Sequence, residues 1–213
     1  MHWYQNLNNN DKLTISHINN SILEKAVIID FEGPKEGKPE FVGYFKDNKF
    51  KTIFLNDAFE SCKTRYSAGC MTLDEFTDLI LKDINEEDRL VIAFSVHEAD
   101  ILLDYFEGSP VHWYRDAHKY FKKYLFHRRY PRPTGWNLDS ILEFYDIEKT
   151  NYGERKISGY IQYAKRDLLR KGHYDQITKS AKTKLTKAVN YNREDVLCLY
   201  KAISISLNKL EGQ

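Results

Sequence analysis

The feature that most constrains the fold is residues 26–34, in which four apolar residues lead into Asp30, Phe31 and Glu32 and a Gly-Pro pair follows. Such a run, closed by breakers, is typical of a buried central strand. Residues two apart on a strand point to the same face. Two neighbouring carboxylates repel each other and are costly to bury, and hard divalent cations prefer oxygen ligands. The pair therefore predicts a metal site, and a strand that simply ends in water is the alternative.

Composition indicates one sizeable core, with charge divided unevenly along the chain. The 213 residues are 42% hydrophobic and carry a net charge of +1. Residues 1–109 hold 20 acidic and 11 basic side chains, a net of −9, whereas residues 110–213 hold 11 and 21, a net of +10. A basic half beside an acidic half suggests a polyanion track next to a carboxylate-rich site, and two ordinary solvated faces are the alternative.

The cysteines and the N-terminal residues favour a reduced, cytoplasmic setting. The three cysteines, Cys62, Cys70 and Cys198, fit neither a zinc site nor a disulfide framework. Residues 1–20 are polar and rich in asparagine, and we find no secretory signal and no transmembrane run. We expect no association with a membrane.

The order of the predicted elements indicates an α/β fold. Expected strands cover 26–31, 40–45, 50–55 and 90–94, and the pattern allows a short one at 111–114. Asp47-Asn48 marks a hairpin turn, and residues 56–71 have the composition of a loop. Helices are expected after Thr72, after residues 95–100, at 117–127, around 138–145 and 157–168, and at 181–208. This order predicts one domain over 1–213, a mixed sheet of antiparallel strands and then βα units flanked by helices, with residues 1–25 as a peripheral arm or edge strand.

Two further segments place acids where elements meet. Glu98 and Asp100 stand between the strand at 90–94 and its helix, and Asp195 stands in the final helix one turn after Tyr191. If the two buried strands are neighbours, these acids can converge with Asp30 and Glu32 at one sheet edge. Four carboxylates there would bind two divalent metals, Mg²⁺ or Mn²⁺, for in-line phosphoryl displacement, with Tyr191 positioning the attacking water.

These motifs resemble those of a known family. Ile29-Asp30-Phe31-Glu32-Gly33 is similar to the first motif of the DEDD-type 3′–5′ exonucleases of the ribonuclease H-like superfamily, and Tyr191-Asn192-Arg193-Glu194-Asp195-Val196 resembles their tyrosine-type third motif. The second motif departs from the common form: Phe94-Ser95-Val96-His97-Glu98 is closer to the YprB-like branch, so Glu98 is the expected ligand and Asp100 the alternative. The resemblance implies a ribonuclease H-like fold and trimming of DNA or RNA from a single-stranded 3′ end.

Basic residues of the C-terminal half are candidate contacts for nucleic acid. Stacking aromatics and phosphate-neutralising bases are what single strands require, and a core of aromatics with solvated bases is the alternative. The candidates are Lys119, Lys122, Lys123, Arg128, Arg129, Lys165 and Arg166. Two other functions stay open: a non-catalytic nucleic-acid-binding module of the same fold, and an endonuclease that uses the same acids.

Overall fold

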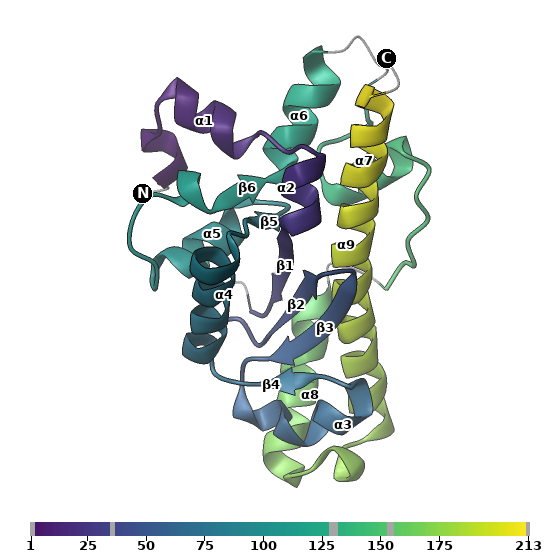
Figure 1. Cartoon of the computed structure of the whole chain (residues 1–213). Helices are drawn as coiled ribbons and strands as arrows, with labels where there is room; N and C mark the ends of the chain where they lie inside the picture. The colour runs from purple at the N-terminus through teal and green to yellow at the C-terminus, as the bar shows by residue number, and fades with distance from the viewer. Residues whose placement is uncertain (1–2, 35–36, 128–131, 153–155, 212–213) are drawn as a thin grey trace.

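The centre of the protein is a six-stranded mixed sheet with helices on both faces (Figure 1). The computed structural model describes residues 3–34, 37–127, 132–152 and 156–211. The strands lie in the order β4-β3-β2-β1-β5-β6, and β2 is antiparallel to both of its neighbours while the remaining pairs are parallel. Their bounds are β1 Val27–Glu32, β2 Phe41–Lys46, β3 Lys49–Phe54, β4 Gly69–Cys70, β5 Val91–Ala93 and β6 Tyr114–Asp116. The predicted α/β class is confirmed, and β1 and β5 are neighbours as expected.

The β2–β3 hairpin forms as the sequence predicts. Its two turn residues, Asp47 and Asn48, have φ angles of 51° and 59°. Both angles lie in the left-handed region, which asparagine and aspartate tolerate better than most residues and which a two-residue hairpin turn requires. The turn aligns Phe41 of β2 with Phe54 of β3 and so sets the register of the hairpin.

Two segments differ from the sequence prediction. Residues 56–71, expected as a loop, contain the 3₁₀ helix η2 (Asp57–Cys62), the short helix α3 (Lys63–Tyr66) and the edge strand β4. The last strand begins at Tyr114, three residues later than expected, because Ser109 caps a 3₁₀ turn, η3 (Pro110–His112), with Pro110 in its first position. Both are elements too short for hydrophobic periodicity to reveal.

The N-terminal residues from Trp3 onward are largely helical and form no edge strand. They form η1 (Trp3–Asn6), α1 (Asn9–Ile15) and α2 (Asn20–Lys25). Asparagine is a weak helix former but a strong N-cap, and Asn8 and Asn19 cap α1 and α2 by accepting hydrogen bonds from backbone N–H groups. The asparagine-rich composition therefore marks helix starts here.

The remaining helices form a layer on each face of the sheet (Figure 1). Helices α4 (Leu73–Glu87) and α5 (Val96–Leu103) cover one face, and α6 (Ala117–His127), α7 (Leu138–Phe144) and the long α9 (Lys179–Glu211) cover the other. Helix α8 (Ile157–Lys171) packs beside the first half of α9, with the short η5 (Tyr174–Gln176) between them. The expected helices are present, including the capping box of Thr72 and Glu75 at the start of α4, but α5 begins at Val96, within the segment expected to precede it.

Strand β1 divides its side chains between these two layers. Val27, Ile29 and Phe31 pack in the core beneath α4 and α5. Ile28 packs in the opposite core with residues of α6, α7 and α9. Since side chains alternate along a strand, Asp30 and Glu32 project to the Ile28 side, toward α9.

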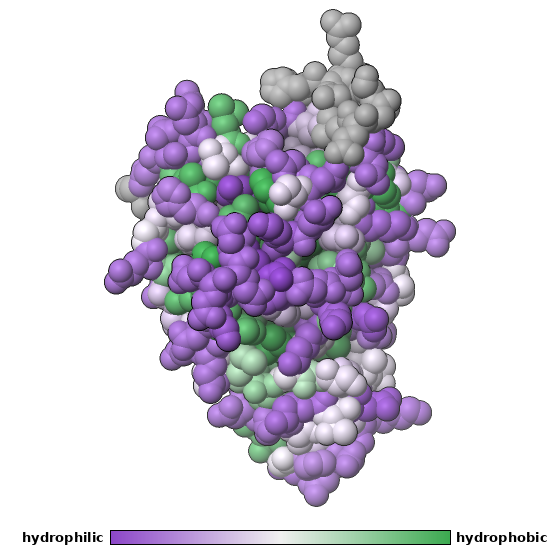
Figure 2. Space-filling model, in the orientation of Figure 1, coloured by the Kyte–Doolittle hydropathy of each residue, from purple (hydrophilic) through white to green (hydrophobic). Residues whose placement is uncertain are grey.

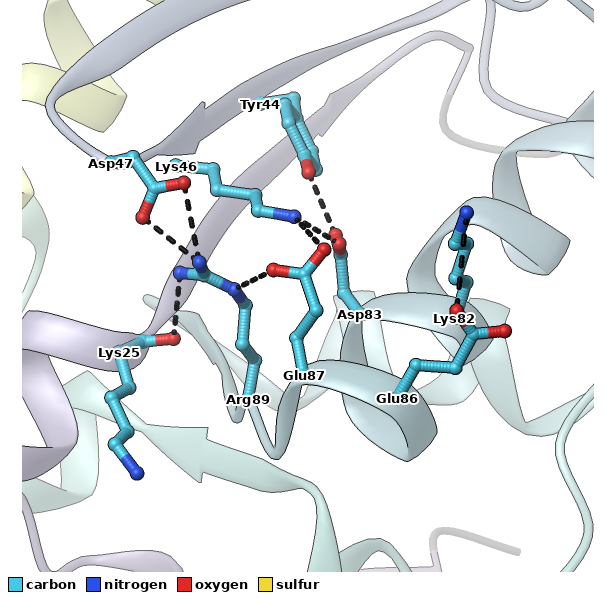
Figure 3. Close-up of polar contacts among 9 residues, drawn as sticks. All are labelled: Lys25, Tyr44, Lys46, Asp47, Lys82, Asp83, Glu86, Glu87 and Arg89. Atoms are coloured by element: carbon cyan, nitrogen blue, oxygen red, sulfur yellow. Dashed lines mark hydrogen bonds and ion pairs between the residues drawn. The ribbon is translucent and has the colours of Figure 1, made fainter.

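A polar network joins the tip of the β2–β3 hairpin to α4 (Figure 3). Its Tyr44 packs in the core beneath α4 and α5, on the side of the sheet opposite Asp30. Asp83 is buried and accepts hydrogen bonds from the Tyr44 hydroxyl at 2.7 Å and from Lys46. Glu87 pairs with both Lys46 and Arg89, and Arg89 also pairs with Asp47 in the turn. These partners satisfy the buried Asp83 carboxylate, so we interpret this acidic group as structural.

The visible surface is largely hydrophilic, broken by small apolar patches (Figure 2). Within the described ranges, no helix combines the length and the apolar character that crossing a bilayer requires. The three cysteines are free thiols, as the sequence predicts.

Candidate metal centre

Three of the predicted acids converge where α9 crosses the carboxyl end of β1. Asp30 and Glu32 come from the strand and Asp195 from the helix, and their ligand oxygens lie within 4.8 Å of one another. Asp195 lies more than 160 residues after the two strand acids in the sequence, so only the packing of α9 on the sheet brings it to them. Asp195 is 8% exposed and the other two are half-buried, so the group is largely, but not completely, withdrawn from solvent.

Close approach of α9 to the sheet depends on Asn192 and Gly43. Asn192 is fully buried, and its Nδ2 donates to the backbone carbonyl of Asp30 at 2.8 Å and to its Oδ2 at 2.7 Å. Gly43 faces Asp30 on β2, and a Cβ there would overlap Asn192 Oδ1 and lie 2.9 Å from Val196 Cγ2. Only glycine leaves room for the helix at this position, and Asn192 then fixes the Asp30 carboxylate.

The acids raise one another's pKa values. Burial raises the pKa of Asp30 well above its ordinary value, and the charges of Glu32, Asp195 and Glu98 raise it further. Burial, with the charges of Asp195 and Glu98, raises the pKa of Glu32 to about 8. Carboxylates this close cannot all ionise without a compensating positive charge, which is the electrostatic condition for binding a cation.

One cation of the chain already lies at this group. Lys149 forms an ion pair with Asp195 and another with Asp139 at 3.0 Å, and its Nζ lies 4.3 Å from the centre of the Tyr191 ring. Its charge lowers the pKa of both Asp195 and Glu32, in each case against the larger effect of burial. Burial lowers the pKa of Lys149, but Asp195 and Asp139 together raise it by more, so the ammonium stays charged.

The segment that carries Lys149 is attached to α9. The Thr150 N–H donates to Glu194 Oε2 at 2.8 Å, and the Tyr152 hydroxyl donates to Glu194 Oε1 at 2.9 Å. Tyr191 lies one turn before Asp195 and lowers the pKa of that carboxyl by a side-chain hydrogen bond. The predicted pairing of Tyr191 with Asp195 on one helix face is therefore present.

Glu98 lies near these acids but outside the group of three within 4.8 Å. It is buried in the first turn of α5 and accepts a hydrogen bond from Ser95 Oγ at 2.9 Å. Burial raises its pKa to about 7, and the charge of Asp116 adds to this. The charge of Glu98 raises the pKa of Asp30 and of Glu32, whereas the charge of Asp100 raises the pKa of Tyr114. Glu98 is thus better placed than Asp100 as a fourth ligand.

The predicted basic residues are distributed over separate surfaces. Lys119, Lys122 and Lys123 line one pocket beside α6, while Arg166 is exposed on α8. Lys165 pairs with buried Glu40 at 2.7 Å, so its charge is already balanced inside the protein. Arg128 and Arg129 lie outside the described residues. The α6 aromatics Tyr120, Phe121 and Tyr124 are core residues, as the alternative interpretation holds.

Three residues of the site were not identified from the sequence. Gly43 had a usable signal, since a lone glycine within a strand often marks a close backbone approach. Asn192 lies inside the Tyr191–Val196 motif, but the motif gives no role to that position. Lys149 lies in a connecting segment without periodicity, and its contact with α9 has no local signature.

The donor set suits a hard divalent cation. All of its ligand atoms are carboxylate oxygens, and the Lys149 ammonium shows that the group attracts positive charge. Asp30, Glu32 and Asp195 could therefore bind a metal ion. Comparison with known protein families, curated proteins and solved structures finds no match to the chain.

Proposed function

We propose that the protein is a metal-dependent nuclease, specifically a 3′–5′ exonuclease of the DEDD, ribonuclease H-like kind. The observation that carries the proposal is the convergence of Asp30, Glu32 and Asp195 within 4.8 Å at the carboxyl end of the central strand. Antiparallel strands followed by parallel ones, with helices on both faces, are compatible with a ribonuclease H-like sheet.

Each residue of the site has a role in this proposal. Asp30, Glu32 and Asp195 would bind the metal, and Glu98 would complete the set from α5. Asn192 holds the Asp30 carboxylate in one orientation, and Tyr191 orients the attacking water from the same helix face as Asp195. When bound, two divalent ions stabilise the attacking and leaving oxygens of a phosphoryl displacement.

A second candidate is a non-catalytic nucleic-acid-binding module. The ion pair of Lys149 with Asp195 favours it, because a permanent ammonium at that position would take the place of a metal. In that case metal ions would leave both stability and nucleic-acid affinity unchanged.

A time course on 5′-labelled single-stranded DNA and RNA distinguishes these functions. We expect a descending ladder from the 3′ end with Mn²⁺ or Mg²⁺, none with chelator, and none with the Asp30→Asn variant. Discrete internal cuts under the same controls would indicate an endonuclease. Full activity of Asp30→Asn would refute the site, and tight binding without cleavage by the wild type would support the binding module.

A further inference from the structure

A basic pocket lies between the N-terminal helices and α6. Its volume is about 420 Å³, and five cationic side chains line it: Lys12, Lys119, Lys122, Lys123 and Arg132. The rings of Tyr4 and Trp136 complete its walls, and no acidic side chain contributes to the lining. The residues come from η1, α1, α6 and the segment before α7, so the fold assembles this pocket from distant parts of the chain.

The lysines of this pocket are held against rings and not against carboxylates. Lys119 Nζ lies 4.7 Å and Lys12 Nζ 5.8 Å from the centre of the Tyr4 ring, and Lys122 Nζ lies 5.7 Å from that of Trp136. Within the described part of the chain, none of these three, nor Lys123, has a carboxylate oxygen within 4.0 Å. Lysines elsewhere do pair with carboxylates, among them Lys25, Lys46 and Lys82, so the lysines of this pocket form a local excess of positive charge.

The excess positive charge lowers the pKa of a neighbouring histidine. Burial lowers the pKa of His118, and the charges of Lys122 and Lys119 lower it further, to about 4. All four lysines are half-buried, so water screens their mutual repulsion less than it would on an open surface. An anion that enters the pocket would relieve that repulsion.

Asp116 links the start of α6 to the carboxyl end of the sheet. This residue ends β6 and caps α6, accepting a hydrogen bond from the Lys119 N–H at 2.9 Å. Strands β1, β5 and β6 are parallel, and Asp116 is paired with Ala93 at the end of β5, so the carboxyl ends of the three strands lie at one edge of the sheet. The start of α6, with Lys119, and the acids of β1 therefore lie along the same edge.

Cations that neutralise phosphates, combined with rings on which bases stack, are the recognition chemistry of single-stranded nucleic acid. In a duplex the base faces are stacked within the helix and could not reach Tyr4 or Trp136. We propose that this pocket binds phosphates and an unpaired base of a single-stranded nucleic acid next to the acidic centre. The binding itself needs no metal. The proposal rests on the proposed function only where it takes the bound strand to be the substrate of the acidic centre.

The test is fluorescence anisotropy with a labelled 12-nucleotide single strand, as DNA and as RNA, in chelator over a range of salt concentrations. The pocket variant is Lys119→Gln/Lys122→Gln, and Lys25→Gln/Lys82→Gln is the control with the same charge change on exposed lysines elsewhere. We expect the pocket variant to bind at least about ten-fold more weakly than wild type. The slope of log K against log salt should fall by about 1.4, the value for the loss of two phosphate contacts on a single strand. The control should bind within about two-fold of wild type.

Trp136 tests the base contact separately from the charge. We expect Trp136→Leu to weaken binding at least about five-fold with an unchanged salt slope, and Trp136→Phe to recover most of the loss. Thermal melting of each variant verifies that it folds, and Lys122→Gln/Lys123→Gln replaces any pocket variant that does not.

Three results would overturn the proposal. The first is that the pocket variant and its control bind the strand equally well. The second is that the wild type binds a matched duplex as well as it binds the single strand. The third is that inorganic polyphosphate competes as well as the unlabelled single strand does and that Trp136→Leu has no effect. The outcome is separable from that of the proposed function. Cleavage that survives in Asp30→Asn would refute the metal centre alone, and cleavage that survives in the pocket variant with undiminished binding would refute the pocket alone.

Discussion

Replacing Glu32 by glutamine should stabilise the metal-free protein and, at the same time, prevent its stabilisation by metal. Glu32 accepts no side-chain hydrogen bond from a described residue, and burial, together with the charges of Asp195 and Glu98, raises its pKa to about 8 from an ordinary value of 4.5. At pH 7 this shift alone corresponds to an upper limit of about 3 kcal/mol of lost folding free energy. Glu32 is half-buried and its neighbours share the repulsion, so we expect a gain of about 1–2 kcal/mol in the variant.

The assay is thermal unfolding of both proteins in chelator and in Mn²⁺ at pH 7. For a chain of this length, the expected gain raises Tm in chelator by about 2–8 °C. In Mn²⁺ the order should reverse, because a ligand at 100 times its Kd adds about 2.7 kcal/mol to a wild type that binds it. The control, Glu24→Gln on an exposed turn of α2, should change stability by less than about 0.5 kcal/mol. A Glu32→Gln variant that melts at or below the wild-type temperature in chelator would refute the account of repulsion.

Three other perturbations test the same geometry. In the folded protein the pKa values of Glu32 and Glu98 are raised to about 8 and about 7, so the folded state retains protons that the unfolded state releases. We therefore expect Tm in chelator to fall as the pH rises from 5 to 8, and a flat profile would contradict this. Gly43→Ala should destabilise by about 1–3 kcal/mol through overlap with α9, measured by urea unfolding, whereas Gly159→Ala, with open space around its Cβ, should stabilise by about 0.5–1 kcal/mol. Lys149→Met should lower Tm in chelator and tighten Mn²⁺ binding about ten-fold, as read from a metal titration of Tm; weaker binding would show that the ammonium supports the metal and does not compete with it.

Local chemistry made much of this fold predictable. The apolar run before Asp30 is β1, the Asp47-Asn48 turn forms the hairpin, and the Thr72 capping box starts α4. In each case a few adjacent residues determine the conformation, through burial, backbone preference or capping. The acidic residues of β1 and α9 were predictable for the same reason, since each lies in a short motif.

What the sequence did not reveal depends on distant contacts. Lys149 reaches Asp195 only because its segment is attached to Glu194, and no pattern around residue 149 encodes that attachment. Tyr4 becomes part of a basic pocket only once η1 lies against α6. The polar N-terminal residues read as a loose arm because their capping role depends on where the helices begin.

The measurement that tests the central claim most directly is equilibrium binding of Mn²⁺, followed by the electron paramagnetic resonance signal of the free ion. The account predicts two ions per chain at saturation for the wild type, and loss of the tighter ion in Asp30→Asn, in which Asn192 still has a side-chain oxygen to pair with. Glu24→Gln should bind as wild type does. A wild type that binds no Mn²⁺ at millimolar concentration, or an Asp30→Asn variant that binds it equally well, would contradict the assignment of these acids as a metal centre.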